Sequence, residues 1–415
     1  MNIVFGFVGQ NAALKFKLLR DAVDQHIQAD LPLKIAQSAD GNGIFALLQP
    51  SGFFPLEKPF YETKHEYLCM LQGYFWYDFP FPESEEEAKR SIIRAGNYLT
   101  RNKYINLSDD NGGLFNYFLY DEKSREFFIS CDLSGIFPLY FITRSDGIYF
   151  SSHIRALSKA LKIDYDPLSV IEHMAFHYTI GRRTLYKGIF RLNAGETLNY
   201  SFSTGKLKFT QPSNLYSDIT SYRNDEEALE ALFHDYYKGV QEICRINQKR
   251  GIMLSGGFDT RLVAFGFYQH ANPIVGLTLG DSENFEVQIA KKLTKIINAD
   301  HKIYSPEPDT QLSSDRIVHL IKTVENVNFA YCDSSGSLLK QMGAETVSTG
   351  YGGETFFGGQ GYSFYGKSLN NKERFKLAFV RSLGFPIKFY DEVNHESFEL
   401  VHSTIMNFHK KRADK

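Results

Sequence analysis

The chain has 415 residues, of which 43% are hydrophobic and 23% are charged. That length and composition are ordinary for a globular protein with two domains, each able to bury a substantial core. The formal net charge of −2 provides no overall basic field, which argues against a nucleic-acid partner.

Cysteine usage and hydropathy exclude further classes. No apolar run of transmembrane length and no signal-peptide pattern stand out, so we expect a cytoplasmic protein without a membrane partner. The cysteines stand alone, without a CxxC pair, which favours neither a zinc site nor a disulfide framework. They are Cys69, Cys131, Cys244 and Cys332.

Residues 1–205 contain short strand-like segments, such as 127–130 and 147–151, separated by turn signals such as Asn-Gly-Gly at 111–113. Residues 206–225 are polar and turn-rich. We therefore place a boundary in this segment and predict one domain over 1–205 and a second over 206–415.

Beyond the boundary, helical and strand patterns alternate. Expected helices cover 226–248, 259–269, 284–298 and 312–326, and expected strands cover 251–254, 273–279, 302–304 and 346–349. Such alternation predicts a parallel sheet, with ligands at the carboxyl ends of its strands. Two glycine-rich segments fall at such ends.

The first segment reads Leu-Ser-Gly-Gly-Phe-Asp-Thr at 254–260. Gly256 and Gly257 permit a tight turn, and the N–H groups at the start of the next helix then form an anion cradle. Ser255 and Thr260 add hydroxyl donors, while Asp259 suits a Mg²⁺ held against phosphates. No lysine closes the loop, which excludes a Walker A motif. The plain alternative is a glycine-rich strand–turn–helix junction.

The second segment, at 349–359, carries five glycines in eleven residues, Gly350 and Gly352 among them. Such a density of glycine indicates backbone packed closely against another group. Glu354 stands where it could share a cation with Asp259, because Mg²⁺ is commonly bound by one or two carboxylates together with phosphates.

Together the two segments resemble the asparagine synthetase superfamily, which pairs an SGGxDS loop, the PP-loop of ATP pyrophosphatases, with a later SGxGxDExxxGG loop. Glu354 stands where the family has Asp. Tyr351 occupies a position that is Glu in asparagine synthetases but Tyr in β-lactam synthetases, whose motif begins TGYG. The resemblance implies an α/β nucleotide-binding domain, with Leu254 and the 255–260 loop, Gly350 and Gly352 around the ATP pyrophosphate.

The N-terminal half resembles a class II glutamine amidotransferase domain at residues 1–9, 113–140 and 183–196. This implies an Ntn-hydrolase-like αββα sandwich. Asn2 stands where the family's nucleophilic Cys belongs, and an amide cannot attack a glutamine carboxamide, so we expect an inactive glutaminase.

The resemblance also suggests nucleotide contacts after the strand at 273–279. Thr278 and Glu286 are candidates near the adenine and ribose. The alternative is a plain helix start capped by Asp281 or Ser282.

The implied reaction uses ATP and Mg²⁺. A small-molecule or peptide carboxylate attacks the α-phosphate, pyrophosphate leaves, and an amine then displaces AMP to form an amide or lactam. The amine must lose a proton, for which the resemblance implies Tyr351 with a glutamate, Glu392 or Glu396. A tyrosine with a pKa near ~10 needs such a partner.

Two alternatives stay open. The chain ends at Lys415 without a recognisable late segment carrying the family's phosphate-contacting lysine, so we expect a shortened synthetase domain; Lys410, Lys411 or Lys415 could substitute. An inactive or truncated relative that binds nucleotide or a partner is one alternative. An ammonia-dependent, asparagine synthetase-like enzyme is the other.

Overall fold

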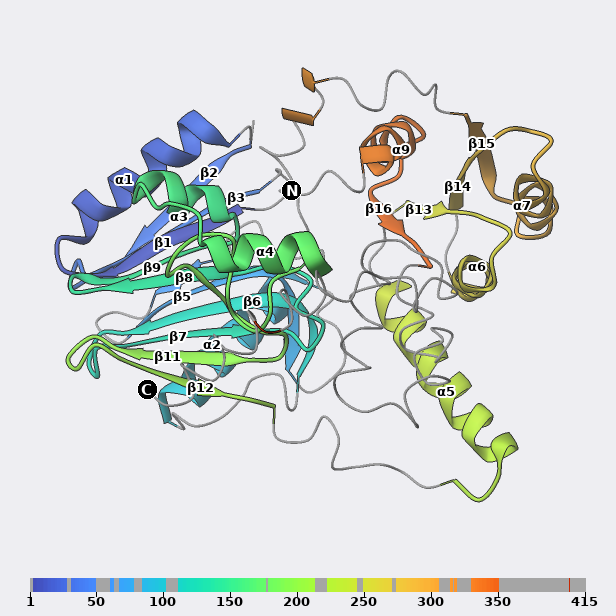
Figure 1. The fold of residues 1–415 in the computed structure, drawn as a ribbon. Coiled ribbons are helices and arrows are strands. Elements are labelled where there is room, and N and C mark those ends of the chain that lie inside the picture. The colour runs from blue at the N-terminus through green and yellow to red at the C-terminus, as the bar shows by residue number, and fades with distance from the viewer. Residues whose placement is uncertain are drawn as a thin grey trace. The chain divides into compact units, whose positions relative to one another are not determined.

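The computed structural model describes residues 3–27, 31–49, 60–62, 67–77, 84–101, 111–176, 178–212, 222–244, 249–270, 274–305, 314–315, 317–318, 330–350 and 403. These residues fall into two compact units (Figure 1). Residues 3–77 and 85–212 belong to the first unit, and residues 222–350 belong to the second. We describe each unit by itself.

Two six-stranded sheets form the first unit. The strand order is β10-β8-β9-β1-β3-β2 in one sheet and β12-β11-β7-β6-β5-β4 in the other. The pairs within them are antiparallel. The strands are β1 Ile3–Gly9, β2 Leu33–Gln37, β3 Gly43–Leu48, β4 Phe60–Glu62, β5 Tyr67–Tyr77, β6 Asn111–Asp121, β7 Glu126–Cys131, β8 Tyr140–Arg144, β9 Gly147–Ser151, β10 Phe190–Arg191, β11 Thr197–Ser201 and β12 Lys206–Thr210.

Strand β6 makes apolar contacts on both of its faces. Phe118 and Tyr120 point into the core between the two sheets, whereas Tyr117 and Leu119, one residue out of phase, pack with helix α2 (Glu85–Arg101) on the outer face. Successive side chains of a strand point to opposite faces, so a strand buried on both faces reads as a continuous apolar run.

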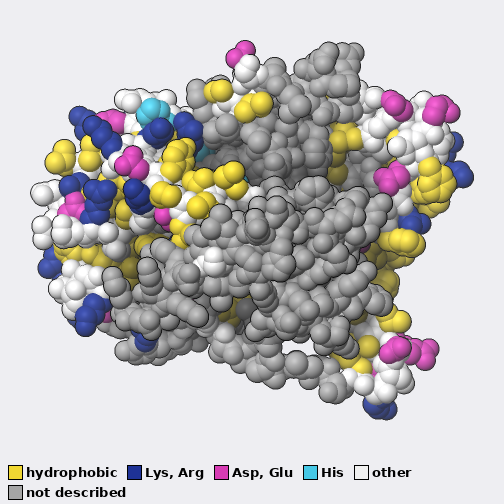
Figure 2. Space-filling model, viewed as in Figure 1, with side chains coloured by type: hydrophobic (Ala, Val, Ile, Leu, Met, Phe, Trp, Pro, Cys, Tyr) yellow, Lys and Arg dark blue, Asp and Glu magenta, His cyan; other side chains and the backbone are white. Residues whose placement is uncertain are grey.

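Helices cover the other sheet in the same way. α1 (Ala12–His26) and α3 (Ile154–Ala160) pack on β1 and β3 through a second apolar cluster. The order of layers is helix, sheet, sheet, helix, so the predicted αββα sandwich is confirmed. A further helix, α4 (Pro167–Phe176), follows α3 in this unit. On the face seen in Figure 2, basic and acidic side chains are interspersed over these elements.

The second unit contains a four-stranded parallel sheet in the order β15-β14-β13-β16. Its elements are α5 Asp225–Cys244, β13 Arg250–Met253, α6 Phe258–His270, β14 Ile274–Leu279, α7 Phe285–Ile296, β15 Asp300–Tyr304, α9 Ala330–Gln341 and β16 Thr346–Ser348. The predicted parallel sheet is confirmed, and the predicted strands and the first three helices lie within a few residues of the observed ones. The predicted helix at 312–326 falls almost entirely outside the described residues.

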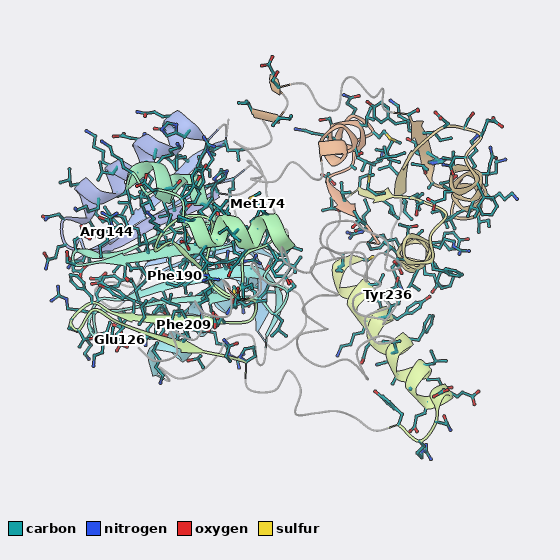
Figure 3. The ribbon with its side chains drawn as sticks, viewed as in Figure 1. Glu126, Arg144, Met174, Phe190, Phe209 and Tyr236 are labelled. Carbon is teal, nitrogen blue, oxygen red and sulfur yellow. The ribbon has the colours of Figure 1, made fainter. Side chains whose placement is uncertain are left out.

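Both faces of this sheet are covered. Ile252 and Ile274 pack with α5, α6 and α7, while Val275 and Leu277 pack with Leu339 of α9. Figure 3 labels Tyr236, a residue of α5. Its hydroxyl donates to the carbonyl of Leu262 in α6 at 2.7 Å. The segment 206–225, in which the sequence predicts the domain boundary, contains β12 of the first unit and reaches the start of α5. Among the described residues, no helix combines the length and the apolarity needed to span a bilayer.

Candidate functional site

The register of the parallel sheet brings three strand ends to one level. Met253 of β13 pairs with Leu277 of β14, and Ile252 pairs with Ser348 of β16. Strand β13 lies between β14 and β16, so the chain leaves β13 toward one edge of the sheet and later returns on its other side. Such a switch in direction opens a crevice at the carboxyl ends of an α/β sheet, the usual place for a ligand.

The segment 254–260 makes the turn at the end of β13. The buried Leu254 anchors it, because its N–H donates to the Leu277 carbonyl at 2.8 Å. The Ser255 and Thr260 hydroxyls lie 3.1 Å apart, and the Gly257 N–H donates to Ser255 Oγ at 3.1 Å. These hydrogen bonds hold the loop in a closed turn, and α6 begins within it at Phe258.

Gly256 is a glycine because α7 lies against it. A Cβ at this position would stand 2.9 Å from the Cα of Glu286 and 3.2 Å from Cδ1 of Ile289. A side chain at 256 would therefore push α7 away. The predicted loop glycine and the predicted Glu286 are thus neighbours.

The start of α7 corrects one expectation. Its N-cap is Asn284, whose side chain accepts the N–H of Glu286 at 2.9 Å. Asp281 instead accepts the hydroxyl of Ser305 at 2.6 Å, and Ser282 does not cap the helix. All three residue types are good caps, and the packing of α7 on the loop decides among them.

Gly350 brings the second glycine segment onto the first. A Cβ at Gly350 would meet Cβ of Asp259 at 2.7 Å and the backbone nitrogen of Thr260 at 2.8 Å. The backbone after β16 therefore lies directly on the first turn of α6. Asp259 is half-buried there, and a carboxylate in the first turn interacts favourably with the helix dipole.

Thr278 is the residue before the last of β14. It is buried, and its hydroxyl lies 2.8 Å from Nε2 of His301. The other ring nitrogen, Nδ1, is 3.3 Å from the Thr294 hydroxyl. Burial, then the charge of Lys291, lowers the pKa of His301. The Thr278 hydroxyl thus has a protein partner, and its predicted nucleotide contact stays a prediction.

ATP with Mg²⁺ fits the donor set that the structure describes. The hydroxyls of Ser255 and Thr260 and the first N–H groups of α6 line one turn, as an anion requires. Asp259 stands beside them, and its carboxylate would hold the Mg²⁺. No group of three or more metal-binding side chains occurs within the described ranges.

Other predicted site residues lie outside the described residues. They are Asn2, Tyr351, Gly352, Glu354, Glu392 and Glu396.

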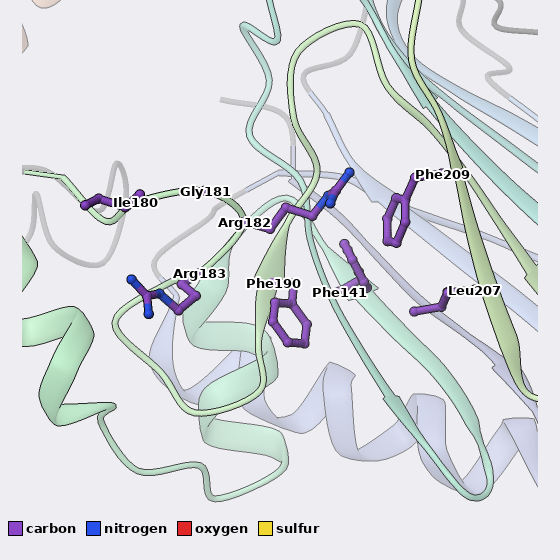
Figure 4. Close-up of a pocket in the computed structure, with 8 residues that line it drawn as sticks. All are labelled: Phe141, Ile180, Gly181, Arg182, Arg183, Phe190, Leu207 and Phe209. Atoms are coloured by element: carbon purple, nitrogen blue, oxygen red, sulfur yellow. The ribbon is translucent and has the colours of Figure 1, made fainter. Parts of the chain in front are cut away.

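The first unit has a cleft of its own, with a volume of about 360 Å³. Phe190 of β10 and Phe209 of β12, from the edge strands of the two sheets, line it together with Phe141 and Leu207 (Figure 4). At one side, the Arg182 guanidinium lies 4.0 Å from the centre of the Phe209 ring.

A buried glutamate fixes the arginine beside this cleft. Glu196 is fully buried and pairs with Arg182 while it accepts the Asn193 N–H at 3.0 Å. Next to it, Arg183 pairs with the fully buried Glu172. We did not predict these two ion pairs. The sequence offers only Gly181 before Arg182 and Gly195 before Glu196 as local signals here, and neither indicates that these charges pair.

Comparison with known families agrees with the resemblances of both halves of the chain. Residues 105–211 match the family profile described as a glutamine amidotransferase domain, and residues 237–411 match the profile described as asparagine synthase. The two domains, in this order, are those of the asparagine synthetase superfamily. The resemblance to this superfamily is therefore confirmed.

Individual superfamily relatives are distant. A putative glutamine-hydrolyzing asparagine synthetase of Mycobacterium tuberculosis is 27% identical over 201 residues, covering 46% of this chain and 30% of the relative. Asparagine synthetase 2 of Oryza sativa subsp. japonica is 25% identical, covering 63% and 42%. The chain thus spans less than half the length of these two curated relatives.

Among solved structures, the allosteric regulatory enzyme of purine biosynthesis covers 84% of this chain with a TM-score of 0.33 and 11% identity. This likeness is too slight to bear on activity.

Proposed function

We propose that the chain is an ATP-dependent, AMP-forming amide-bond synthetase. It adenylates a small-molecule or peptide carboxylate and then joins the acyl group to an amine, giving an amide or a lactam. The proposal takes its reaction class from the asparagine synthase profile at residues 237–411.

One observation supports the proposal most strongly. Gly350 lies against Asp259 and Thr260, so the start of the second glycine segment meets the end of the first near the carboxyl end of the sheet. In a parallel α/β sheet this is where a ligand binds. Loop N–H groups, two hydroxyls and one carboxylate at a single strand end suit a nucleotide triphosphate with a divalent cation.

Bound ATP supplies an α-phosphate open to attack and a pyrophosphate leaving group. The residues of the 255–260 loop would hold the phosphates through N–H groups and the hydroxyls of Ser255 and Thr260, and so stabilise the charge that develops on the leaving group. Asp259, with Glu354, would hold Mg²⁺. Glu286, which lies beside Gly256, would contact the nucleotide.

The nitrogen source in this proposal is an amine of the substrate and not glutamine. Asn2 lacks a nucleophilic side chain. Tyr351, with Glu392 or Glu396, would take the proton from the attacking amine. The tyrosine in the TGYG string favours a lactam or a specialised amide over asparagine.

The names of the relatives favour a second candidate. Curated relatives are described as asparagine synthetases, so aspartate as the acid and free ammonia as the amine are the alternative pair.

Pyrophosphate exchange into ATP tests the proposal. Full-length protein with Mg²⁺ is supplied with a panel of amino-acid, β-amino-acid and peptide carboxylates, with aspartate included. We expect exchange with one class of acid and a loss of at least ~100-fold in Asp259→Ala, because a single electrostatic contact in a transition state is worth that much.

The outcomes separate the candidates. Exchange with aspartate alone, followed by ammonia-dependent AMP release, would select the asparagine-forming alternative. ATP binding without exchange across the panel would indicate a non-catalytic nucleotide-binding relative. Failure to bind ATP at all would overturn the synthetase proposal.

A further inference from the structure

The glycine loop carries a positive side chain at its rim. Arg261 stands in the first turn of α6, directly after the 254–260 loop. Its Nε lies 3.4 Å from the carbonyl oxygen of Gly257. Its guanidinium carbon lies 4.2 Å from the centre of the Phe258 ring. Both contacts are with the loop, so the guanidinium lies over the turn.

Helix geometry explains this position. Residues three and four apart share one face of a helix, and a long side chain leans back toward the N-terminus. Arg261 therefore covers residues 257 and 258 and does not extend along α6. The Nε contact occupies one edge of the guanidinium. Arginine has five N–H donors in a planar fork, so the terminal Nη groups stay available to a second partner.

The charge at this place favours an anion as its partner. A cation in the first turn of a helix is disfavoured by the helix dipole, whose positive end lies there. Of the ion pairs formed among the described residues, none includes Arg261. The free N–H groups of α6 and the guanidinium thus add their positive potential at one rim of the loop.

We propose that Arg261 binds the β- and γ-phosphates of ATP and the pyrophosphate formed from them. This inference rests on the proposed function and assigns a residue to it. When the carboxylate oxygen forms its bond to the α-phosphorus, the bond from that phosphorus to the bridging oxygen breaks. The bridging oxygen keeps the electron pair, and Arg261 neutralises the charge that the pyrophosphate gains. The fork of arginine matches phosphate oxygens in pairs.

Inorganic pyrophosphate with Mg²⁺ is the direct probe. Isothermal titration of the full-length protein compares wild type, Arg261→Gln, Arg261→Lys and a control, Arg223→Gln, which removes an exposed guanidinium from α5's N-terminal end. Thermal melts establish that each variant is folded. We expect Arg261→Gln to weaken pyrophosphate binding by roughly 10- to 100-fold, the range for a hydrogen bond to a charged group.

Two comparisons exclude a structural role. AMP lacks the two terminal phosphates, so its affinity should be equal in wild type and Arg261→Gln. Arg261→Lys keeps the charge but loses the fork and should fall between the two. The control should bind pyrophosphate as wild type does.

Failure of the inference and failure of the proposed function look different. If wild type binds pyrophosphate and Arg261→Gln binds it equally well, Arg261 has no such role while the synthetase proposal stands. An equal loss of AMP and pyrophosphate affinity would show that Arg261 only shapes the loop, which also overturns the inference. If wild type binds neither ATP nor pyrophosphate, both proposals fail.

Discussion

In the first unit, Glu172 and Glu196 are completely buried and each meets an arginine inside the fold. In the second unit, Asp259 and Arg261 are only partly buried at the rim of a glycine loop. The buried carboxylates of the first unit are paired within the protein, whereas the half-buried groups of the second unit lie at the loop where a ligand would bind.

The comparison shows what each unit can lose. Removing one partner of a buried ion pair leaves an uncompensated charge and lowers the free energy of unfolding, so the first unit depends on its ion pairs for stability. Partly exposed groups at a strand end contribute little to folding and are free to serve binding. Substitutions in the first unit should therefore change stability, and those in the loop should change ligand affinity.

Breaking the Arg183–Glu172 pair should give the largest effect on stability. Glu172→Ala leaves a buried guanidinium without its carboxylate, and we expect a loss of about 3–5 kcal/mol in the free energy of unfolding of the first unit. Urea titration followed by fluorescence of the single tryptophan, Trp76 in β5, measures it. Glu227→Ala, which breaks an exposed pair with Arg223 in the second unit, should leave this transition of the first unit unchanged, because exposed ion pairs contribute little to stability. Equal losses would contradict the comparison.

A side chain at Gly350 should disturb the loop in the second unit. Gly350→Ala places a Cβ within 2.8 Å of two atoms of Asp259 and Thr260, and overpacking of this kind costs about 1–3 kcal/mol. Because the clash falls on the cradle, we expect weaker ATP binding by calorimetry while the unfolding of the first unit is unchanged. Gly336→Ala in α9, where a Cβ meets nothing within 4 Å, is the matched control. Unaltered ATP affinity in Gly350→Ala would count against the close approach of the two segments.

A gain in stability is expected away from the loop. Gly239 lies inside α5, and a Cβ there would have no atom within 4 Å. Gly239→Ala should stabilise the second unit by about 0.5–1 kcal/mol, because glycine loses more conformational freedom in a helix than alanine does. Denaturation followed by circular dichroism should show this gain in stability. Unchanged ATP affinity in the same variant would show that α5 supports the fold while the 254–260 loop serves binding. A loss of stability would contradict this account of α5.

The smallest effect should be a pH dependence in the second unit. Burial and Lys291 lower the pKa of His301, so the unfolded chain takes up the proton first as the pH falls. This contribution to stability is complete above the ordinary histidine pKa of ~6.5 and is lost as the pH falls through the lower folded value. Hydrogen exchange in β14 at pH 7.5 and 5.5 should show it. His301→Gln should flatten the difference; an equal difference in the variant would exclude His301 as its source.

Much of the second unit could be predicted from the sequence, because its elements alternate and end in strong signals. Glycines 256 and 257 mark the turn after β13, and the apolar runs before them define the strand. Helix α9 was missed since Ser334-Ser335-Gly336-Ser337 reads as a loop. Its burial of Leu339 against β14 outweighs that weak local preference.

The site could be predicted in outline but not in its contacts. Asp281, Ser282 and Asn284 are interchangeable as caps in sequence, and only the packing of α7 on Gly256 selects Asn284. Nothing local shows that the Thr278 hydroxyl meets His301, because that residue comes from the next strand, β15. Arg261 was not predicted, because the familiar phosphate-binding loop is closed by a lysine within its motif, whereas this positive charge is an arginine one residue beyond the 254–260 segment.

The contact of Gly350 with Asp259 joins residues that are far apart in the order of synthesis. A ribosome adds roughly 5–20 residues per second, so the second segment emerges several seconds after the first. During that interval the 254–260 loop lacks the backbone of Gly350 that later packs against it. A nascent chain stalled before Gly350 should therefore hold ATP poorly, and tight binding would mark the moment at which this unit is complete.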